Sequence, residues 1–202
     1  LSLLHKQLGI LDEQYVPLRD LIIKSGIIRS PLFFAMSIFL QKDKLYQQLM
    51  SPGLNTKNKS TKPQDIFEET ICNFLSSAGL SAVYLGVHEN LKDQLGNIIG
   101  SADILAYDKD TGTLLAISCK TSMPDHNSVD KIHNTSIAIK SRLPSFLDVI
   151  NVEPFIFTTQ IAEIQKEEAK KFGVTIIDKS ALENLFNLAQ ERTLKYDDLK
   201  KL

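Results

Sequence analysis

Two charged residues, Asp103 and Lys120, stand in surroundings where charge is costly, because their sequence neighbours are apolar. Asp103 lies within residues 100–106, and Lys120 ends the apolar run of residues 114–119. A charge set against apolar strands is unfavourable unless an opposite charge or a metal ion compensates it. Both positions are therefore candidates for a functional site, with a structural salt bridge at the end of a sheet as the alternative.

The turn between these two segments predicts how they face each other. If residues 109–112 form a four-residue hairpin loop, Asp103 lies opposite Ser118. Side chains alternate along a strand, so Asp103, Ser118 and Lys120 share one face and Cys119 points to the other. Asp103 and Lys120 then become diagonal neighbours, about 7–8 Å apart at the backbone. A slip of one residue in the pairing would separate them.

The elements that must hold these residues alternate between helix and strand. Apolar spacing predicts a helix over 63–78, beginning at Pro63 and stopping before Gly79. The remaining pattern predicts strands over 82–87, 98–107 and 113–119, a helix over 128–143, a strand over 155–159, a helix over 161–172 and a strand over 174–178. Ser180 and Glu183 have the capping-box spacing for a last helix. The order αβββαβαβα predicts an α/β fold of three layers, a mixed β-sheet flanked by helices.

Residues 1–56 are predicted to form an N-terminal helical extension. Helices over 15–24 and 31–49, separated by a turn at Ser25 and Gly26, have a weak helix-turn-helix outline. The second helix is apolar nearly all round, so we expect it to pack against the body or a second subunit rather than to contact base edges. A basic linker at 57–62 leads to the main domain at 63–190, and 191–202 form a C-terminal tail.

The net charge of -1 gives the chain no overall field that would attract a polyanion. Eight acidic and two basic residues lie within 63–119, between basic stretches at 57–62 and 120–144. Binding to a polyanion therefore depends on local patches, with ordinary solvated surface as the alternative. The candidate contacts are Lys57, Lys59, Lys62, Lys131, His133, Lys140 and Arg142.

Several other functions are disfavoured by the sequence. Cys72 and Cys119 make no disulfide framework, and the four histidines have no metal-ligand spacing with them. A nucleophilic Cys119 is disfavoured because it alternates away from Lys120. No Gly-rich phosphate loop follows the first strand, which argues against a doubly wound small-molecule enzyme. We expect no membrane span and an intracellular, cytoplasmic location, in the host cytoplasm if the chain is viral.

Three short segments resemble motifs of the PD-(D/E)xK nuclease superfamily, whose members share the restriction endonuclease-like core. Phe67-Glu68 resembles its helical glutamate motif, residues 101–106 its aspartate strand and residues 117–121 its E-x-K strand. The later strand, helix, strand and closing helix make residues 63–188 most similar to Mrr-type endonucleases and archaeal Holliday junction resolvases.

The resemblance implies a DNA endonuclease that depends on Mg²⁺ or Mn²⁺ and prefers Holliday-junction-like or branched DNA. Asp103, Glu68 and the backbone carbonyl of Cys119 would hold the metal through oxygen ligands, and Lys120 would orient or activate water. Glu69 is the competing helical carboxylate, but Glu68 borders the apolar row of the helix. DNA is the implied partner, and the apolar N-terminal helices offer a surface for a homodimer or higher homo-oligomer.

Ser118 departs from the family pattern, which has Glu or Asp two residues before the lysine. A serine hydroxyl is a poor Mg²⁺ ligand beside a carboxylate, so the site loses one negative ligand. Three outcomes stay open. The site works with Asp103 and Glu68 alone, another carboxylate takes the place of the missing one, or catalysis is lost and the chain is a DNA-binding or assembly protein.

Overall fold

The computed structural model describes residues 31–39, 62–85, 90–92, 98–143, 149 and 151–201. The predicted helix over 15–24, the turn after it and most of the basic linker, including Lys57 and Lys59, lie outside these residues. The part of the chain that contains Asp103, Ser118 and Lys120 lies within them.

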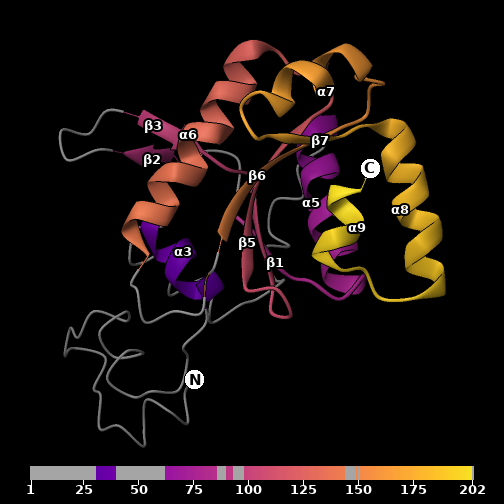
Figure 1. The fold of residues 1–202 in the computed structure, drawn as a ribbon, viewed down its shortest axis with the longest axis horizontal. Coiled ribbons are helices and arrows are strands. Elements are labelled where there is room, and N and C mark those ends of the chain that lie inside the picture. The colour runs from indigo at the N-terminus through magenta and orange to yellow at the C-terminus, as the bar shows by residue number, and fades with distance from the viewer. Residues whose placement is uncertain are drawn as a thin grey trace, which may run out of the picture.

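A five-stranded mixed sheet forms the centre of the fold, in the strand order β1-β4-β5-β6-β7 (Figure 1). β1 (Ser81–Tyr84) pairs antiparallel with β4 (Ile104–Asp108), and β4 pairs antiparallel with β5 (Thr113–Lys120). β6 (Asn151–Thr158) and β7 (Thr175–Ile177) extend the sheet parallel to β5. A central strand with parallel pairing is buried on both faces, which explains the continuous apolar run of β5.

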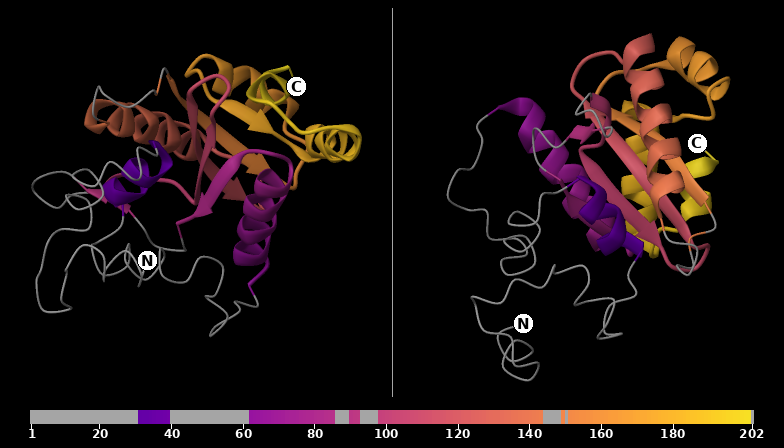
Figure 2. Two further views of the ribbon diagram at one scale, coloured as in Figure 1. Left: turned by 90° about the horizontal axis from the view of Figure 1, so that it is seen from below. Right: turned by 90° about the vertical axis from the view of Figure 1, so that its left-hand side faces the viewer.

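Helices cover both faces of this sheet and make three layers (Figures 1 and 2). The first face is covered by α3 (Pro31–Phe39), α6 (His126–Arg142) and α7 (Glu163–Lys170). The second face is covered by α5 (Pro63–Ser77), α8 (Lys179–Glu191) and α9 (Tyr196–Lys200). The prediction of a mixed sheet flanked by helices is therefore confirmed at this level.

The alternation of side chains along β5 divides the apolar core in two. Leu114 and Ala116 pack toward α6, whereas Leu115, Ile117 and Cys119 pack toward α5 and α8. All five side chains have no exposed surface. Because the period of a strand is two, the next residues on the α6 side are Ser118 and Lys120, where the apolar run ends.

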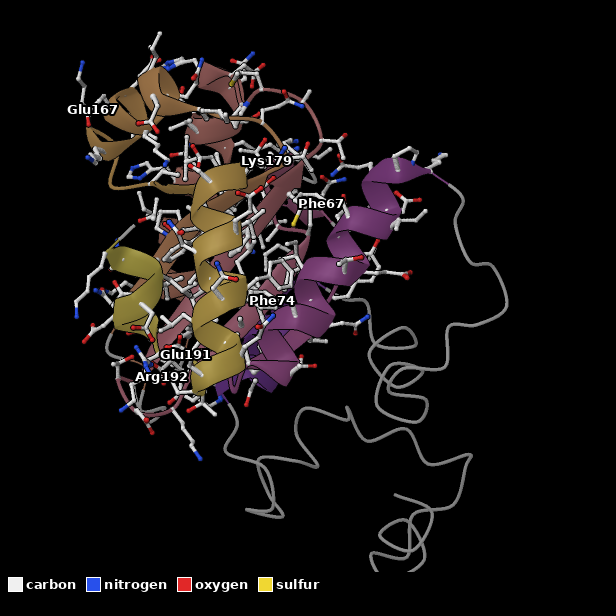
Figure 3. All side chains as sticks on the ribbon, turned by 90° about the vertical axis from the view of Figure 1, so that its right-hand side faces the viewer. Phe67, Phe74, Glu167, Lys179, Glu191 and Arg192 are labelled. Atoms are coloured by element: carbon white, nitrogen blue, oxygen red, sulfur yellow. The ribbon has the colours of Figure 1, made fainter. Side chains whose placement is uncertain are left out.

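α5 and α8 lie side by side on the second face (Figure 3). The rings of Phe74 from α5 and Phe186 from α8 have centroids 4.2 Å apart, and Leu75 and Leu185 from the same two helices are buried in one apolar cluster. This packing fixes α5 on the sheet, and with it the position of Glu68.

The prediction of one continuous strand over 98–107 is wrong. The chain forms β3 (Ile98–Ser101), leaves the strand at Ala102 and Asp103, and resumes as β4. β3 pairs with β2 (Asn90–Lys92) in a separate two-stranded sheet that the sequence pattern did not reveal. β3 is held against α6 by Thr135, whose hydroxyl accepts from the backbone N–H of Ser101 at 3.0 Å. Tertiary contact with α6 therefore draws the segment out of the main sheet.

The helices near the two ends of the described chain differ in part from the predicted ones. The capping box at Ser180 is wrong, because α8 begins at Lys179 and Asp178 is its N-cap. The predicted C-terminal tail contains α9, and Leu194 and Leu199 are buried against the second face. Residues 31–39 form α3, which packs on the first face of the body, as expected for an apolar helix.

Candidate active site

The hairpin between β4 and β5 has the register that its loop length predicts. The pairs run from Asp108 with Thr113 to Ile104 with Ile117. The hairpin is held by the Asp108 carboxylate, which accepts from the hydroxyl of Thr111 at 3.1 Å. A short turn with its own hydrogen bonds is a local feature, which is why the sequence was sufficient to predict this pairing.

Asp103 lies in the break between β3 and β4, one residue before Ile104, the last β4 residue of the paired ladder. Its backbone N–H donates to the carbonyl of Ile117 at 2.8 Å. Its side-chain Oδ2 accepts from the backbone N–H of Cys119 at 2.7 Å and from the Ser118 hydroxyl at 3.2 Å. The carboxylate is therefore held against the last residues of β5. Asp103 and Ser118 lie side by side as predicted, but they are not a ladder pair, because the Asp103 N–H bonds to Ile117 instead.

A pocket of about 160 Å³ opens at this end of β5, beside the first turns of α6. Asp103, Ser118 and Lys120 all line it, so the structure brings together the three residues predicted to share one strand face. The full lining is Ser101, Asp103, Ser118, Lys120, Asp125, Asn127, Ser128, Lys131 and Ile132.

The N-terminus of α6 borders the pocket because Asp125 starts the helix there. The Asp125 side chain accepts from the backbone N–H of Ser128 at 2.8 Å, which is the N-cap arrangement. These hydrogen bonds hold the pKa of Asp125 below its usual range. Lys131, one turn further along, lines the same pocket.

Burial and charge act in opposite directions on Asp103. Burial raises the pKa of its carboxyl, while the Cys119 N–H, Lys120, the Ser118 hydroxyl and Lys131 lower it, and the net shift is upward. The surrounding donors and cations therefore do not fully compensate the cost of burying the carboxylate.

Glu68 approaches the same strand end from the other side of the sheet and does not line the pocket. It is 4% exposed, whereas the competing Glu69 is exposed, so the structure places Glu68 at the sheet. Its Oε2 accepts from the Tyr84 hydroxyl at 3.0 Å. Burial raises the pKa of Glu68, and the charge of Asp103 raises it further, so the two carboxylates repel each other.

Gln64 is the site residue that the sequence reasoning missed. Its Nε2 donates to Oε1 of Glu68 and to the backbone carbonyl of Cys119, both at 2.7 Å. Its Oε1 accepts from the backbone N–H and the hydroxyl of Thr121, at 3.1 and 3.0 Å. The signal was present in the spacing, because Gln64 precedes Glu68 by four residues and so lies on the same face of a helix.

The donor set fits a hard divalent cation. Two carboxylates and a backbone carbonyl are the oxygen ligands that Mg²⁺ and Mn²⁺ take, and the repulsion between Asp103 and Glu68 is of the kind that a cation relieves. Among the residues that the structure describes, no group of three or more His, Cys, Asp or Glu side chains could hold a metal ion. Any cation here would therefore depend on these two carboxylates, backbone oxygen and water.

The predicted DNA-contacting residues are not all brought together. Lys131 lines the pocket, and His133 packs edge-on against the Phe172 ring with centroids 6.3 Å apart. Lys140 follows Lys131 by nine residues, about 13 Å along a helix. It donates to Asn151 at the start of β6, at the opposite end of the sheet from the pocket. Arg142 lies beyond it, at the last residue of α6.

Lys62 is the one member of the basic linker within the described residues. It is exposed and forms the N-cap position of α5, directly before Pro63 and two residues from Gln64. Its backbone therefore lies near the candidate site, whereas Lys57 and Lys59 lie outside the described residues.

Both cysteines are buried on the α5 side of the sheet. Burial raises the pKa of Cys72 to about 11 and holds the pKa of Cys119 well above its usual range. Cys119 points away from the pocket, as the alternation of side chains predicted. Neither thiol has the lowered pKa that a nucleophilic cysteine needs.

Comparison of the chain with known protein families and with curated proteins finds no match. No helix within the described residues is long and apolar enough to cross a membrane.

Proposed function

We propose that this chain is a metal-dependent endonuclease that hydrolyses DNA phosphodiester bonds. The observation that supports it most directly is the pocket at the end of β5, where Asp103, Ser118 and Lys120 meet with Lys131. A half-buried carboxylate next to two lysines and a second carboxylate is a costly arrangement for folding, and such arrangements concentrate at functional sites.

The arrangement suits phosphoryl chemistry. Lys120 and Lys131 line the pocket and would supply positive charge for a phosphate group there, and Lys120 would hold the attacking water. Asp103, Glu68 and the Cys119 carbonyl would hold the cation. When bound, a divalent cation supplies Lewis acidity and lowers the pKa of its water. Ser118 positions Asp103 through its hydrogen bond, rather than replacing the missing carboxylate.

The size of the pocket favours a phosphate group over a whole small-molecule substrate. Ligand pockets for small molecules measure about 300–1,000 Å³. A pocket of about 160 Å³ is smaller, and its lining is mostly polar or charged. It suits one phosphate with water, presented by a polymer that lies across the surface.

The substrate and assembly belong to the same proposal. Branched or junction-like DNA follows from the resemblance to resolvases, and a homodimer would place two such sites on opposite strands. A cytoplasmic location agrees with two cysteines that take no part in a disulfide.

A second candidate is a DNA-binding or assembly protein without catalysis. Two observations favour it. Ser118 supplies no charge, and the amide of Gln64 already donates hydrogen bonds to both Glu68 and the Cys119 carbonyl. In that case the pocket binds phosphate but does not activate water.

Cleavage of labelled branched, duplex and single-stranded DNA in Mg²⁺ and in Mn²⁺ separates the candidates. We expect the wild type to cleave at least one substrate and Asp103→Asn to lose that activity, while Asp110→Asn, an exposed turn residue, keeps it. If no substrate is cleaved in either metal while DNA is still bound, the nuclease proposal fails and the second candidate stands.

The salt dependence of DNA binding tests which lysines contact phosphate. Lys131→Ala should reduce the slope of log K against log salt by about 1. Lys140→Ala is the matched control on the same helix and should leave the slope unchanged, because its side chain lies at the other end of the sheet. Equal effects of the two substitutions would contradict a phosphate site in the pocket.

A further inference from the structure

The side-chain amide of Gln64 uses its full hydrogen-bonding capacity at the candidate metal site. An amide has two N–H donors and an oxygen with two lone pairs. Both donors are used, by Glu68 Oε1 and the Cys119 carbonyl, and both lone pairs accept from Thr121. Gln64 therefore joins the first turn of α5 to the last residues of β5.

The orientation of this amide follows from its partners. A backbone N–H can only donate, so the group facing the N–H of Thr121 must be the oxygen of Gln64. A backbone carbonyl can only accept, so the group facing the carbonyl of Cys119 must be the nitrogen. The two constraints agree, and rotating the amide by 180° would break both contacts.

The nitrogen of Gln64 thus lies 2.7 Å from two of the three oxygen groups expected to hold a cation. Each N–H places partial positive charge against an oxygen, which is also what a cation would do there. An N–H donor and a cation cannot use the same lone pair at the same time. A cation that bridges Glu68 Oε1 and the Cys119 carbonyl on the side where Nε2 now lies would therefore break both hydrogen bonds.

We propose that Gln64 is a built-in competitor of the divalent cation: its amide holds Glu68 and the Cys119 carbonyl in the metal-free protein and is displaced when the cation binds. The inference rests on the proposed function, because it takes these oxygens to be the metal ligands. It makes the affinity for metal depend on a side chain that is not itself a ligand. Gln64 is a positioning residue in this scheme.

Mn²⁺ alone is the probe, titrated calorimetrically into the full chain. Gln64→Ala should bind Mn²⁺ about tenfold more tightly than the wild type, because the competing donors are gone. Tenfold corresponds to about 1.4 kcal/mol, which is about the net contribution of one hydrogen bond. Binding should be lost in Asp103→Asn in either background.

Two further variants test whether a change in Mn²⁺ affinity comes from the competing amide or from a general loss of structure. Thr121→Val removes one of the contacts that hold the amide and leaves every expected ligand in place, so it should tighten Mn²⁺ binding by a smaller factor, about threefold. Gln160→Ala is the matched control. Its amide donates to the backbone carbonyl of Thr121 and to the Thr159 hydroxyl rather than to Glu68 or Cys119, so the affinity should stay at the wild-type value.

A second readout observes the displacement in the wild type. The side-chain amide NMR signals of Gln64, assigned by their absence in Gln64→Ala, should shift on adding Mg²⁺ far more than those of Gln160. An unchanged Gln64 signal at saturating Mg²⁺ would contradict displacement.

The outcomes separate this inference from the proposed function. Asp103-dependent Mn²⁺ binding that is equal or weaker in Gln64→Ala overturns the competitor role and leaves the metal site standing. Binding in Gln64→Ala but not in the wild type supports the role in its strongest form. If neither folded protein binds Mn²⁺, the metal-dependent function fails and the inference fails with it.

Discussion

Two aspartates in this molecule, the buried Asp178 and the half-buried Asp103, differ in how far hydrogen-bond donors offset the burial of their carboxylates. Asp178 has no exposed surface, and each of its oxygens accepts two hydrogen bonds. The donors are Lys166, Ser180 and the backbone N–H groups of Ala162 and Ala181, at 2.9 to 3.2 Å. Burial alone would raise the pKa of Asp178, but these donors outweigh it and lower the pKa to about 2.

Asp103 is less well compensated. Within the described part of the chain, its carboxylate accepts hydrogen bonds from Cys119 and Ser118 alone. Its pKa is raised, and it repels Glu68. A carboxylate stabilises a fold when its hydrogen bonds and ion pairs are worth more than the cost of burying it. When they are worth less, the carboxylate stores unfavourable energy that a ligand can relieve. The comparison separates a structural cap at α8 from a candidate functional group at β5.

The largest expected effect is on cleavage. Asp103→Asn keeps an oxygen for the Cys119 and Ser118 donors but removes the charge, so the rate should fall on the order of 10³-fold, or about 4 kcal/mol of transition-state stabilisation. Asp178→Asn should leave the rate per folded molecule unchanged. Single-turnover cleavage with folded protein quantified by circular dichroism measures both, and a comparable loss in the two variants would erase the distinction.

The next largest effect is on stability, and here Asp178→Asn should be more damaging than Asp103→Asn. Asp178→Asn removes the closer counter-charge of the half-buried Lys166 and turns amide N–H groups toward donors that the carboxylate accepts from. The free energy of unfolding should therefore fall by about 3 kcal/mol. Asp103→Asn should cost nothing or add a few tenths of a kcal/mol, because the repulsion with Glu68 disappears. Urea denaturation at pH 7 gives both values, and a larger loss in Asp103→Asn would refute the assignment of roles.

The contributions of Asp178 and Asp103 to the free energy of unfolding should change with pH in opposite directions. The folded pKa of Asp178 lies below its unfolded value of 3.8, so its stabilisation is complete above about pH 5 and is lost as the pH falls through about 2. Asp103 has a raised folded pKa, so its ionisation costs stability as the pH rises above the unfolded value.

Urea midpoints from pH 2 to 7 measure this contrast. The deficit of Asp178→Asn relative to the wild type should shrink, by about 2 kcal/mol, toward pH 2. Any advantage of Asp103→Asn should instead be absent at low pH and grow as the pH rises. Two differences with the same sign would show that the carboxylates do not differ as described.

The smallest effect is expected from Ser118→Ala. Its hydroxyl gives Asp103 one hydrogen bond at 3.2 Å, while the shorter bond from Cys119 stays, so the change in unfolding free energy should be under about 1 kcal/mol. The apparent pKa of Asp103, followed by carboxyl ¹³C NMR, should rise because a donor to the charged form is lost. A large loss of stability would mean that Ser118, and not Cys119, holds the carboxylate.

Local rules predict much of this fold and half of the candidate site. The helix over 63–78 follows from apolar spacing between Pro63 and Gly79, and the structure ends α5 at Ser77. The register of β4 and β5 follows from a four-residue loop, and with it the shared face of Asp103, Ser118 and Lys120. Each of these depends on residues close in sequence, where period and turn geometry determine the outcome.

Other features of the site depend on how α5 and α6 pack on the sheet. These are the contacts of Glu68 with Gln64 and Tyr84. They also include the position of Lys131, which lines the pocket, whereas Lys140 lies at the far end of α6. The same is true of the break before β4, which exists because β3 packs against α6. Helix-to-sheet packing is the sum of many apolar contacts between distant segments, and no single period in the sequence encodes it. Strand alternation thus placed the charges of the candidate site, and only the tertiary packing decided which polar groups surround them.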